Sequence, residues 1–194
     1  MEAPTAPFTV LFVCTGNVHR SVLAERLLAR HAGRGVRVFS AGTRPPGPYP
    51  MDPATRAVLE RRGGDGRDFA SRRLTAALVA EASLVLGMER EHREAAVRLR
   101  PVALRRIFTL REFLRLAEGA SGEPGEVVAH AAGMRGEAVP VDAEQDAVSD
   151  PWGRGPEALS ACGALLDVHI AALAALLTQR PVRGTGPEPT SLTS

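Results

Sequence analysis

Cys14 and Arg20 are separated by five residues, and Ser21 follows directly. Five residues can curl into a loop whose backbone N–H groups point inward, with a thiolate at its base and a guanidinium at its rim. Arginine grips tetrahedral oxyanions through two parallel N–H bonds, and a serine hydroxyl can donate to a thiolate. Gly16 and Asn17 both tolerate the left-handed backbone of a tight loop. These residue types therefore predict a site where a thiolate attacks a bound oxyanion.

The stretches on either side of this loop would position it. Residues 8–13 are a short apolar run rich in β-formers, which predicts a strand. An amphipathic run with Val22, Leu23, Leu27 and Leu28 on one side follows the loop and predicts a helix. A helix N-terminus offers unpaired N–H groups and a partial positive charge, which hold anions and stabilise a thiolate. The expected phosphate-binding residues are Thr15, Gly16, Asn17, Val18, His19, Arg20 and Ser21.

A second candidate for the chemistry lies in Asp150-Pro151-Trp152. When a thiolate displaces an alkoxide or phenoxide, a proton donor at the leaving oxygen helps, and a carboxylic acid is the usual donor. Pro151 keeps Asp150 extended, and Trp152 offers a flat apolar wall for an aromatic leaving group. The predicted catalytic residues are therefore Cys14, Arg20 and Asp150.

The residues from Val13 to Ser21, followed by Ala24-Glu25, resemble the signature of the low-molecular-weight protein-tyrosine-phosphatase family. Its fold is shared with arsenate reductases that are coupled to thioredoxin. Ser40-Ala41-Gly42-Thr43 is similar to the family's second block, and Asp150-Pro151-Trp152 resembles its general-acid loop. The resemblance implies phosphotyrosine on a protein, or an aryl phosphate, as substrate. It also implies phosphate and vanadate as inhibitory oxyanions.

Several positions depart from the family pattern. His19 stands where many members carry a second cysteine, Val22 replaces a proline, and Glu89 replaces an aspartate. His19 either packs or biases the thiolate electrostatically, and we favour packing. The family places an aromatic recognition wall in its second block, where Tyr49 is the nearest aromatic residue. Tyr49 and Trp152 are therefore the predicted substrate wall.

Strand and helix patterns alternate along the chain. The expected strands are 8–13, 36–39, 83–88 and 105–108. The alternation predicts an α/β fold: a four-stranded parallel sheet with helices on both faces and the phosphate loop after the first strand. We expect one domain over residues 8–178, a flexible lead-in at 1–7 and a disordered tail at 179–194. Residues 118–141 are expected to be a surface elaboration that shapes substrate access.

The composition excludes several classes of protein. The 194 residues include 24 basic ones, all arginine, and 22 acidic ones, interspersed, which argues against a nucleic-acid surface. No stretch is expected to span a membrane, although the last helix is rich in Ala and Leu. Cys14 and Cys162 do not make a disulfide framework, and a reactive cysteine favours a reducing compartment. We therefore expect a cytoplasmic enzyme.

The predicted reaction is hydrolysis of a phosphate monoester through a phosphocysteine on Cys14, with Asp150 as acid and then as base. Because Arg20 and the loop amides supply the positive charge, no metal and no cofactor are expected. Two alternatives stay open. An arsenate reductase would need further cysteines, and only Cys162 remains. A non-catalytic oxyanion- or phosphopeptide-binding module would need neither a nucleophile nor an acid.

Overall fold

The structure is a computed structural model that describes residues 7–139 and 141–178. The lead-in predicted at 1–7, apart from Pro7, and the tail predicted at 179–194 lie outside the described residues. The strands are β1 (Phe8–Cys14), β2 (Val36–Gly42), β3 (Leu84–Gly87) and β4 (Ile107–Thr109). The α-helices are α1 (Arg20–Ala32), α2 (Pro53–Glu60), α3 (Ala76–Glu81), α4 (Arg90–Leu99), α5 (Leu110–Leu116), α6 (Pro124–Met134) and α7 (Gly155–Thr178). Two short 3₁₀ helices are η1 (Gly33–Gly35) and η2 (Pro101–Arg106).

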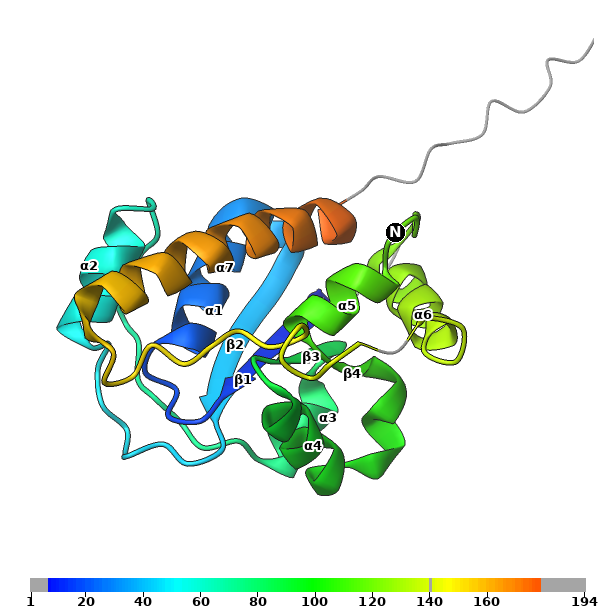
Figure 1. Ribbon diagram of the computed structural model, residues 1–194, viewed down its shortest axis with the longest axis horizontal. Coiled ribbons are helices and arrows are strands. Elements are labelled where there is room, and N and C mark those ends of the chain that lie inside the picture. The colour runs from blue at the N-terminus through cyan, green and yellow to red at the C-terminus, as the bar shows by residue number, and fades with distance from the viewer. Residues whose placement is uncertain (1–6, 140, 179–194) are drawn as a thin grey trace, which may run out of the picture.

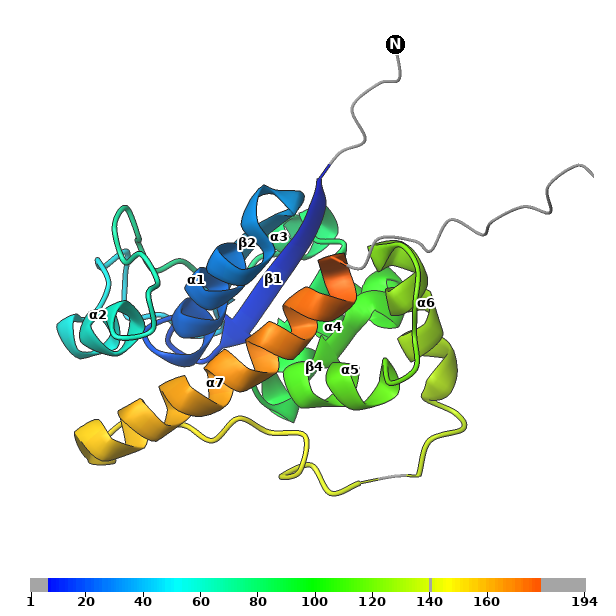
Figure 2. The ribbon, with the colours of Figure 1, turned by 90° about the horizontal axis from the view of Figure 1, so that it is seen from above.

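The four strands form one parallel sheet in the order β2-β1-β3-β4, which confirms the predicted fold class. Side chains alternate across β1: Val10 and Phe12 pack in one core cluster, and Leu11 and Val13 pack in the other. Figures 1 and 2 show α1 and α7 on one face of the sheet and α3 and α4 on the other. Both faces of the sheet are therefore covered, as parallel sheets require.

The strand ends converge at one edge of the sheet. Cys14 pairs with Gly42 at the ends of β1 and β2, and Gly87 at the end of β3 pairs with Thr109. A Cβ atom built at Gly42 would lie 2.7 Å from the carbonyl oxygen of Thr15, so no larger residue fits there without a shift. The loop after Cys14 therefore sits directly against the end of β2, at the edge where open α/β sheets bind ligands.

The prediction that residues 118–141 form a surface elaboration shaping substrate access needs correction. Helix α6 lies in this segment, and its Val127 and Ala131 are completely buried in the main core cluster. It packs against η2, α5 and α7, and its Val128 lines a hollow beside Phe8, at the start of β1. This segment therefore extends the core at the end of the sheet opposite Cys14.

Helix α7 bears on the expectation that no stretch spans a membrane, which stays a prediction. By length and composition it is apolar enough to cross a membrane, with a mean hydropathy of 1.8 in its most apolar window. It packs along α1, and Leu166, Ile170 and Leu173 are fully buried there. Its apolar composition therefore serves a long core helix in this fold.

Candidate active site

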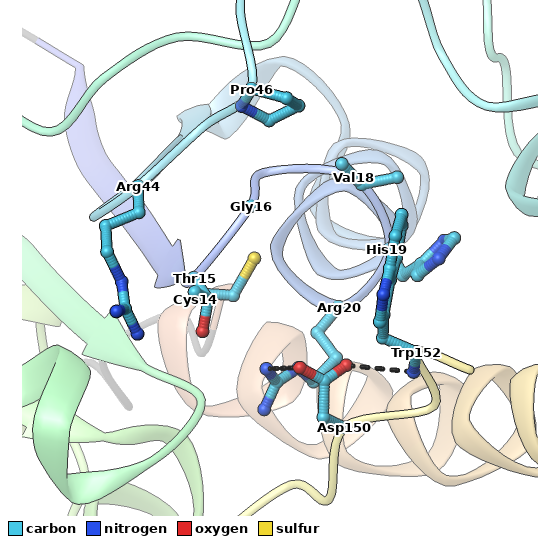
Figure 3. Close-up of a pocket in the computed structure, with 10 residues that line it drawn as sticks. All are labelled: Cys14, Thr15, Gly16, Val18, His19, Arg20, Arg44, Pro46, Asp150 and Trp152. Atoms are coloured by element: carbon cyan, nitrogen blue, oxygen red, sulfur yellow. Dashed lines mark hydrogen bonds and ion pairs between the residues drawn. The ribbon is translucent and has the colours of Figure 1, made fainter. Parts of the chain in front are cut away.

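A pocket opens at the carboxyl edge of the sheet, where the cysteine loop (residues 14–21) meets the acid loop (residues 148–153). Its volume is about 290 Å³. Figure 3 shows Cys14 between Arg44 on one side and Trp152 on the other. The complete lining is Cys14, Thr15, Gly16, Val18, His19, Arg20, Arg44, Pro46, Asp150 and Trp152. Cys14, Arg20 and Asp150, the predicted catalytic residues, therefore share one cavity.

The cysteine loop ends where α1 begins, at Arg20. The residue before the helix, His19, makes no side-chain capping hydrogen bond. The first turn of an α-helix always leaves backbone N–H groups without partners inside the helix. In α1 these groups, with the helix dipole, remain available to a bound anion, as the sequence predicts.

Asn17 holds the cysteine loop in its curled shape. It is fully buried and has a φ of 52°, a left-handed conformation that asparagine tolerates better than most residues. Its amide nitrogen donates to the hydroxyls of Ser21 (3.0 Å) and Ser40 (2.8 Å). Its side-chain oxygen accepts the backbone N–H of Arg72 at 2.9 Å. Every donor and acceptor of the buried amide therefore has a partner, which offsets the cost of burying it.

Cys14 lies beneath this network. Its side chain is 3 % exposed, and its Sγ lies 2.9 Å from the Oγ of Ser21. Because the Ser21 oxygen already accepts a hydrogen bond from Asn17, its own hydrogen is free to point at the sulfur. Donation from Ser21 to Cys14 stabilises the thiolate form, which is the nucleophilic one.

Arg20 is a buried cation held from two sides. Its side chain is only 2 % exposed. One terminal nitrogen donates to Glu89 Oε2 at 2.7 Å and to the carbonyl of Val148 at 3.0 Å, and the other donates to Asp150 Oδ2 at 2.6 Å. Among the described residues, its Nε has no hydrogen-bond partner. This nitrogen and the remaining N–H of the second terminal nitrogen are therefore available to a phosphate oxygen.

Glu89 is a site residue that the sequence reasoning missed. In the sequence it is noticeable only as a departure from the family's aspartate. In the structure it comes just after β3, at the same edge as Cys14, and its carboxylate orients Arg20. An acidic residue directly after a buried parallel strand is the signal that could have revealed it.

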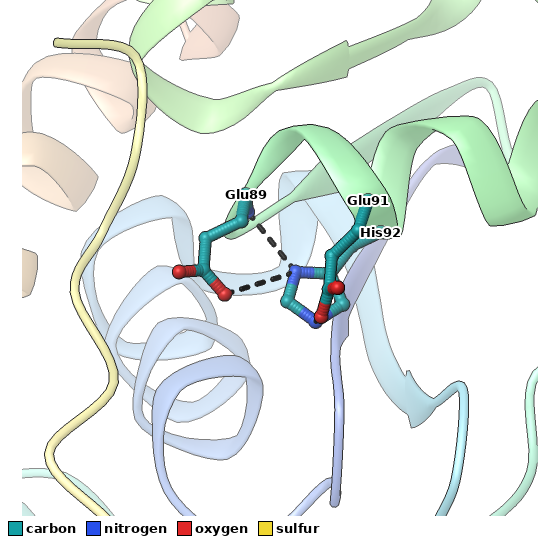
Figure 4. A group of neighbouring side chains, drawn as sticks. All are labelled: Glu89, Glu91 and His92. Atoms are coloured by element: carbon teal, nitrogen blue, oxygen red, sulfur yellow. Dashed lines mark hydrogen bonds and ion pairs between the residues drawn. The ribbon is translucent and has the colours of Figure 1, made fainter. Parts of the chain in front are cut away.

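His92 supports the cysteine loop from α4 (Figure 4). Its ring is completely buried, and its Nδ1 accepts the backbone N–H of Glu89 at 3.0 Å. The hydrogen is therefore on Nε2, which donates to the hydroxyl of Thr15 at 2.9 Å. Burial, with a contribution from the charge of Arg20, lowers the pKa of His92 to about 4. Glu89, Glu91 and His92 lie close enough to suggest a cation site, but both ring nitrogens of His92 are already engaged in hydrogen bonds.

His19 and Trp152 form one wall of the pocket. Their ring centroids are 5.5 Å apart, and Figure 3 shows the two side chains next to each other. The Nδ1 of His19 lies 2.5 Å from the hydroxyl of Thr55, which in turn donates to Asp52. Burial lowers the pKa of His19, which favours the neutral ring. These contacts fit the interpretation that His19 packs, with Trp152 as its partner.

Tyr49 does not line the pocket, so the structure does not support its predicted role as a substrate wall. Its backbone N–H donates to Ser71 Oγ at 3.0 Å, and its ring lies over Gly47. The proline-rich turn therefore holds the Tyr49 ring over Gly47, outside the lining of the pocket. Arg44 and Pro46, earlier in the same turn, line the pocket instead.

Cys162, the other cysteine, lies on α7 and is buried. Burial raises the pKa of its thiol to about 11, so the thiol stays protonated at neutral pH. A protonated thiol is a poor nucleophile. This state fits the structural role predicted for Cys162 and not a role in electron transfer.

The chain is similar in sequence to known phosphatases. The sequence profile of the family described as low molecular weight phosphotyrosine protein phosphatase matches residues 9–124. The probable low molecular weight protein-tyrosine-phosphatase EpsP of Ralstonia nicotianae is 36 % identical over 104 residues, which cover 54 % of this chain and 71 % of EpsP. A protein-arginine-phosphatase of Geobacillus stearothermophilus is 32 % identical over 118 residues, covering 61 % of this chain and 79 % of the relative.

Solved structures share the architecture. The YwlE arginine phosphatase of Geobacillus stearothermophilus has a TM-score of 0.67 at 28 % identity, covering 87 % of this chain and 91 % of that one. The Erwinia amylovora tyrosine phosphatase AmsI has a TM-score of 0.69 at 20 % identity, covering 92 % and 99 %, and shows the same fold. Because the profile spans more than half of the chain, this protein belongs to the low-molecular-weight phosphotyrosine protein phosphatase family and is a phosphatase.

Proposed function

We propose that this phosphatase hydrolyses phosphotyrosine on proteins through a phosphocysteine intermediate on Cys14. The observation that carries the proposal is the contact of 2.9 Å between Cys14 Sγ and Ser21 Oγ, in the pocket that also holds Arg20 and Asp150. A hydroxyl that donates to a sulfur at the base of an anion site is what a thiolate nucleophile requires.

The first step forms an S–P bond and breaks the P–O bond of the ester. Phosphate docks on the N–H groups of the cysteine loop and on Arg20, whose remaining donors can grip two of its oxygens. Cys14 attacks in line, and Asp150 transfers its proton to the leaving oxygen. In the second step water attacks phosphorus, the S–P bond breaks, and Asp150 takes a proton from the water.

Asp150 must be protonated for the first step. Its Oδ2 accepts a hydrogen bond from Arg20 at 2.6 Å. A phosphate dianion bound to Arg20 competes for the same guanidinium and adds negative charge beside Asp150. Both effects weaken the pairing of Arg20 with Asp150. Substrate binding would therefore release the Asp150 carboxyl toward the leaving oxygen.

The side chains around the pocket favour an aromatic leaving group. Val18, Pro46 and Trp152 line the pocket above Cys14 and offer apolar surface to a ring. Asp150 is the one carboxylate in the lining of the pocket, and the same lining holds the two cations Arg20 and Arg44, which disfavour a cationic leaving group. Phosphotyrosine therefore fits better than phosphoarginine, the substrate that the arginine phosphatases among the relatives imply.

The test compares wild type and Cys14→Ser with EDTA present, on p-nitrophenyl phosphate, a phosphotyrosine peptide and a phosphoarginine peptide. We expect Cys14-dependent phosphate release from the first two substrates and a phosphocysteine trapped by acid quenching. Full activity in Cys14→Ser would refute the nucleophile, and faster release from phosphoarginine would refute the substrate class. Vanadate binding without hydrolysis would favour a binding module, and arsenate turnover with thioredoxin would favour a reductase.

Asp150→Ala tests the general acid. We expect a loss of about 10²- to 10⁴-fold in kcat for an alkyl-substituted phenyl phosphate, which has a poor leaving group, and a smaller loss for p-nitrophenyl phosphate. Equal losses on both substrates would indicate that another group donates the proton. Independence from metals and a cytoplasmic location stay predictions.

A further inference from the structure

Arg44 is held at the rim of the pocket by the backbone on either side of it. The N–H of Thr43 donates to the carbonyl of Cys14 at 2.9 Å, and the N–H of Arg44 donates to the carbonyl of Thr15 at 2.8 Å. Pro45 and Pro46 follow directly and restrict the chain further. The backbone from which the Arg44 side chain projects is therefore fixed relative to the nucleophile.

The guanidinium of Arg44 has no partner among the residues that the structure describes. Its side chain is exposed and lines the pocket, yet it makes no ion pair and no side-chain hydrogen bond within 7–139 and 141–178. Arg20 is the opposite case, since Glu89 and Asp150 both hold it. Arg44 is thus a cation at the rim whose hydrogen-bond donors face solvent.

Arg44 lies on the side of the pocket opposite Trp152, with Cys14 between them (Figure 3). Burial is the main cause of the low pKa of His92, and the charges of Arg20 and Arg44 lower it further, so Arg44 is within electrostatic reach of the cysteine loop. If the phosphate of a substrate binds Arg20 and its ring packs against Trp152, the side of the substrate away from Trp152 lies next to Arg44.

We propose that Arg44 binds the carboxylate of an acidic residue next to the phosphotyrosine and so gives the enzyme a preference for acidic target sequences. The inference rests on the function proposed above. A guanidinium presents a planar fork of donors that matches a carboxylate, and a fixed backbone lowers the entropy lost on pairing. The pocket holds the phosphotyrosine itself, so Arg44 would read the residue beside it.

The experiment measures kcat/KM on phosphotyrosine peptides that differ only in the flanking residues, which are either alanine or glutamate. The enzymes are wild type, Arg44→Ala, Arg44→Glu and Arg100→Ala. Arg100 is an exposed arginine that follows α4, at the far end of the sheet from the pocket, and serves as the matched control. The readout is the ratio of kcat/KM for the acidic peptide to that for the neutral peptide.

We expect wild type and Arg100→Ala to favour the acidic peptide by about 2- to 5-fold, the size of an exposed ion pair. Arg44→Ala should bring the ratio close to one, and Arg44→Glu should invert it. The preference should shrink in 0.5 M salt, because exposed charges are screened. Two results would overturn this inference alone, provided that both peptides are turned over. In the first, Arg44→Ala leaves the ratio unchanged; in the second, Arg100→Ala lowers it as much as Arg44→Ala does. No phosphate release from either peptide by the wild-type enzyme would overturn the proposed function as well.

Discussion

The base and the rim of the pocket differ in burial and in hydrogen bonding. The cysteine loop forms the base, and Arg44, Pro46 and Trp152 form the rim. Cys14, Asn17, Arg20 and Ser21 are each 3 % exposed or less, and each is held by side-chain hydrogen bonds. At the rim, Trp152 is 67 % exposed and Arg44 faces solvent without a partner among the described residues.

This difference separates the chemistry from the recognition of the substrate. Buried polar groups must keep their partners, so a substitution at the base leaves an unsatisfied neighbour and shifts the catalytic geometry. Solvent can replace a lost contact at the rim, so a substitution there changes binding by a smaller amount. We therefore expect variants of the base to lower kcat or stability, and variants of the rim to raise KM.

Among the residues that support the base from outside the cysteine loop, the largest effect is expected from Glu89→Ala. Arg20 would lose the carboxylate that fixes one of its terminal nitrogens at 2.7 Å, while its buried charge would remain. A small displacement of the guanidinium from the phosphate site should lower kcat on p-nitrophenyl phosphate on the order of 10- to 100-fold. Steady-state kinetics would measure this, together with vanadate affinity.

Glu91→Ala is the matched control for Glu89→Ala. Glu91 is also an acidic residue of the α4 start, but its side chain is 60 % exposed and makes no contact with Arg20. It should keep wild-type kinetics. Equal losses in the two variants would mean that general negative charge near α4 matters, and not the orientation of Arg20.

The low pKa of His92, which supports the cysteine loop, predicts that the protein loses stability in acid. Its pKa is about 4 in the folded protein against 6.5 for an ordinary histidine. Between these pH values the unfolded chain binds a proton that the folded protein does not, so stability falls as the pH falls below 6.5. By pH 5 the loss from this residue should reach about 2 kcal/mol.

Urea unfolding at pH 7.5 and pH 5.0 would measure this loss. A glutamine in His92→Gln can accept from Glu89 and donate to Thr15 without titrating, so its acid loss should be smaller by about 2 kcal/mol. His130→Gln, a change at an exposed histidine of α6, should keep the wild-type dependence. The same acid loss in wild type and His92→Gln would exclude His92 as the cause.

The base could largely be predicted from the sequence, because its signals are local. Cys14, Arg20 and Ser21 lie within eight consecutive residues, where a clear strand runs into a clear helix. Asp150 reaches them because the backbone N–H of Val148 donates to the carbonyl of Met88, just after β3. Glu89 could not be assigned in this way. Its partner Arg20 is 69 positions away in the sequence, and only the order of the strands brings the two together.

The rim and the periphery were harder to predict, for two physical reasons. Tyr49 has the right chemistry for a wall, but the hydrogen bonds of its turn to Ser71 direct it elsewhere. Six of the eleven residues of α6 are apolar, but glycine, serine and proline surround this possible helix, a pattern typical of a surface excursion. Burial against η2 and α5 decides their place, and no local pattern encodes that contact.

The smallest predicted effect belongs to the rim and concerns Trp152. Its ring lies 5.5 Å from that of His19 and lines the pocket where an aromatic leaving group would stack. An aromatic contact of this kind contributes about 0.5–1.5 kcal/mol, so Trp152→Ala should raise KM for a phosphotyrosine peptide about 2- to 10-fold with little change in kcat. Trp152→Phe should retain most of the affinity, because it keeps a ring against His19.

The opposite outcome would be a lower kcat in Trp152→Ala with KM unchanged. Trp152 would then act by positioning Asp150, two residues before it, and the acid loop would belong with the base of the pocket. Whether kcat or KM changes therefore shows where the boundary between the base and the rim lies.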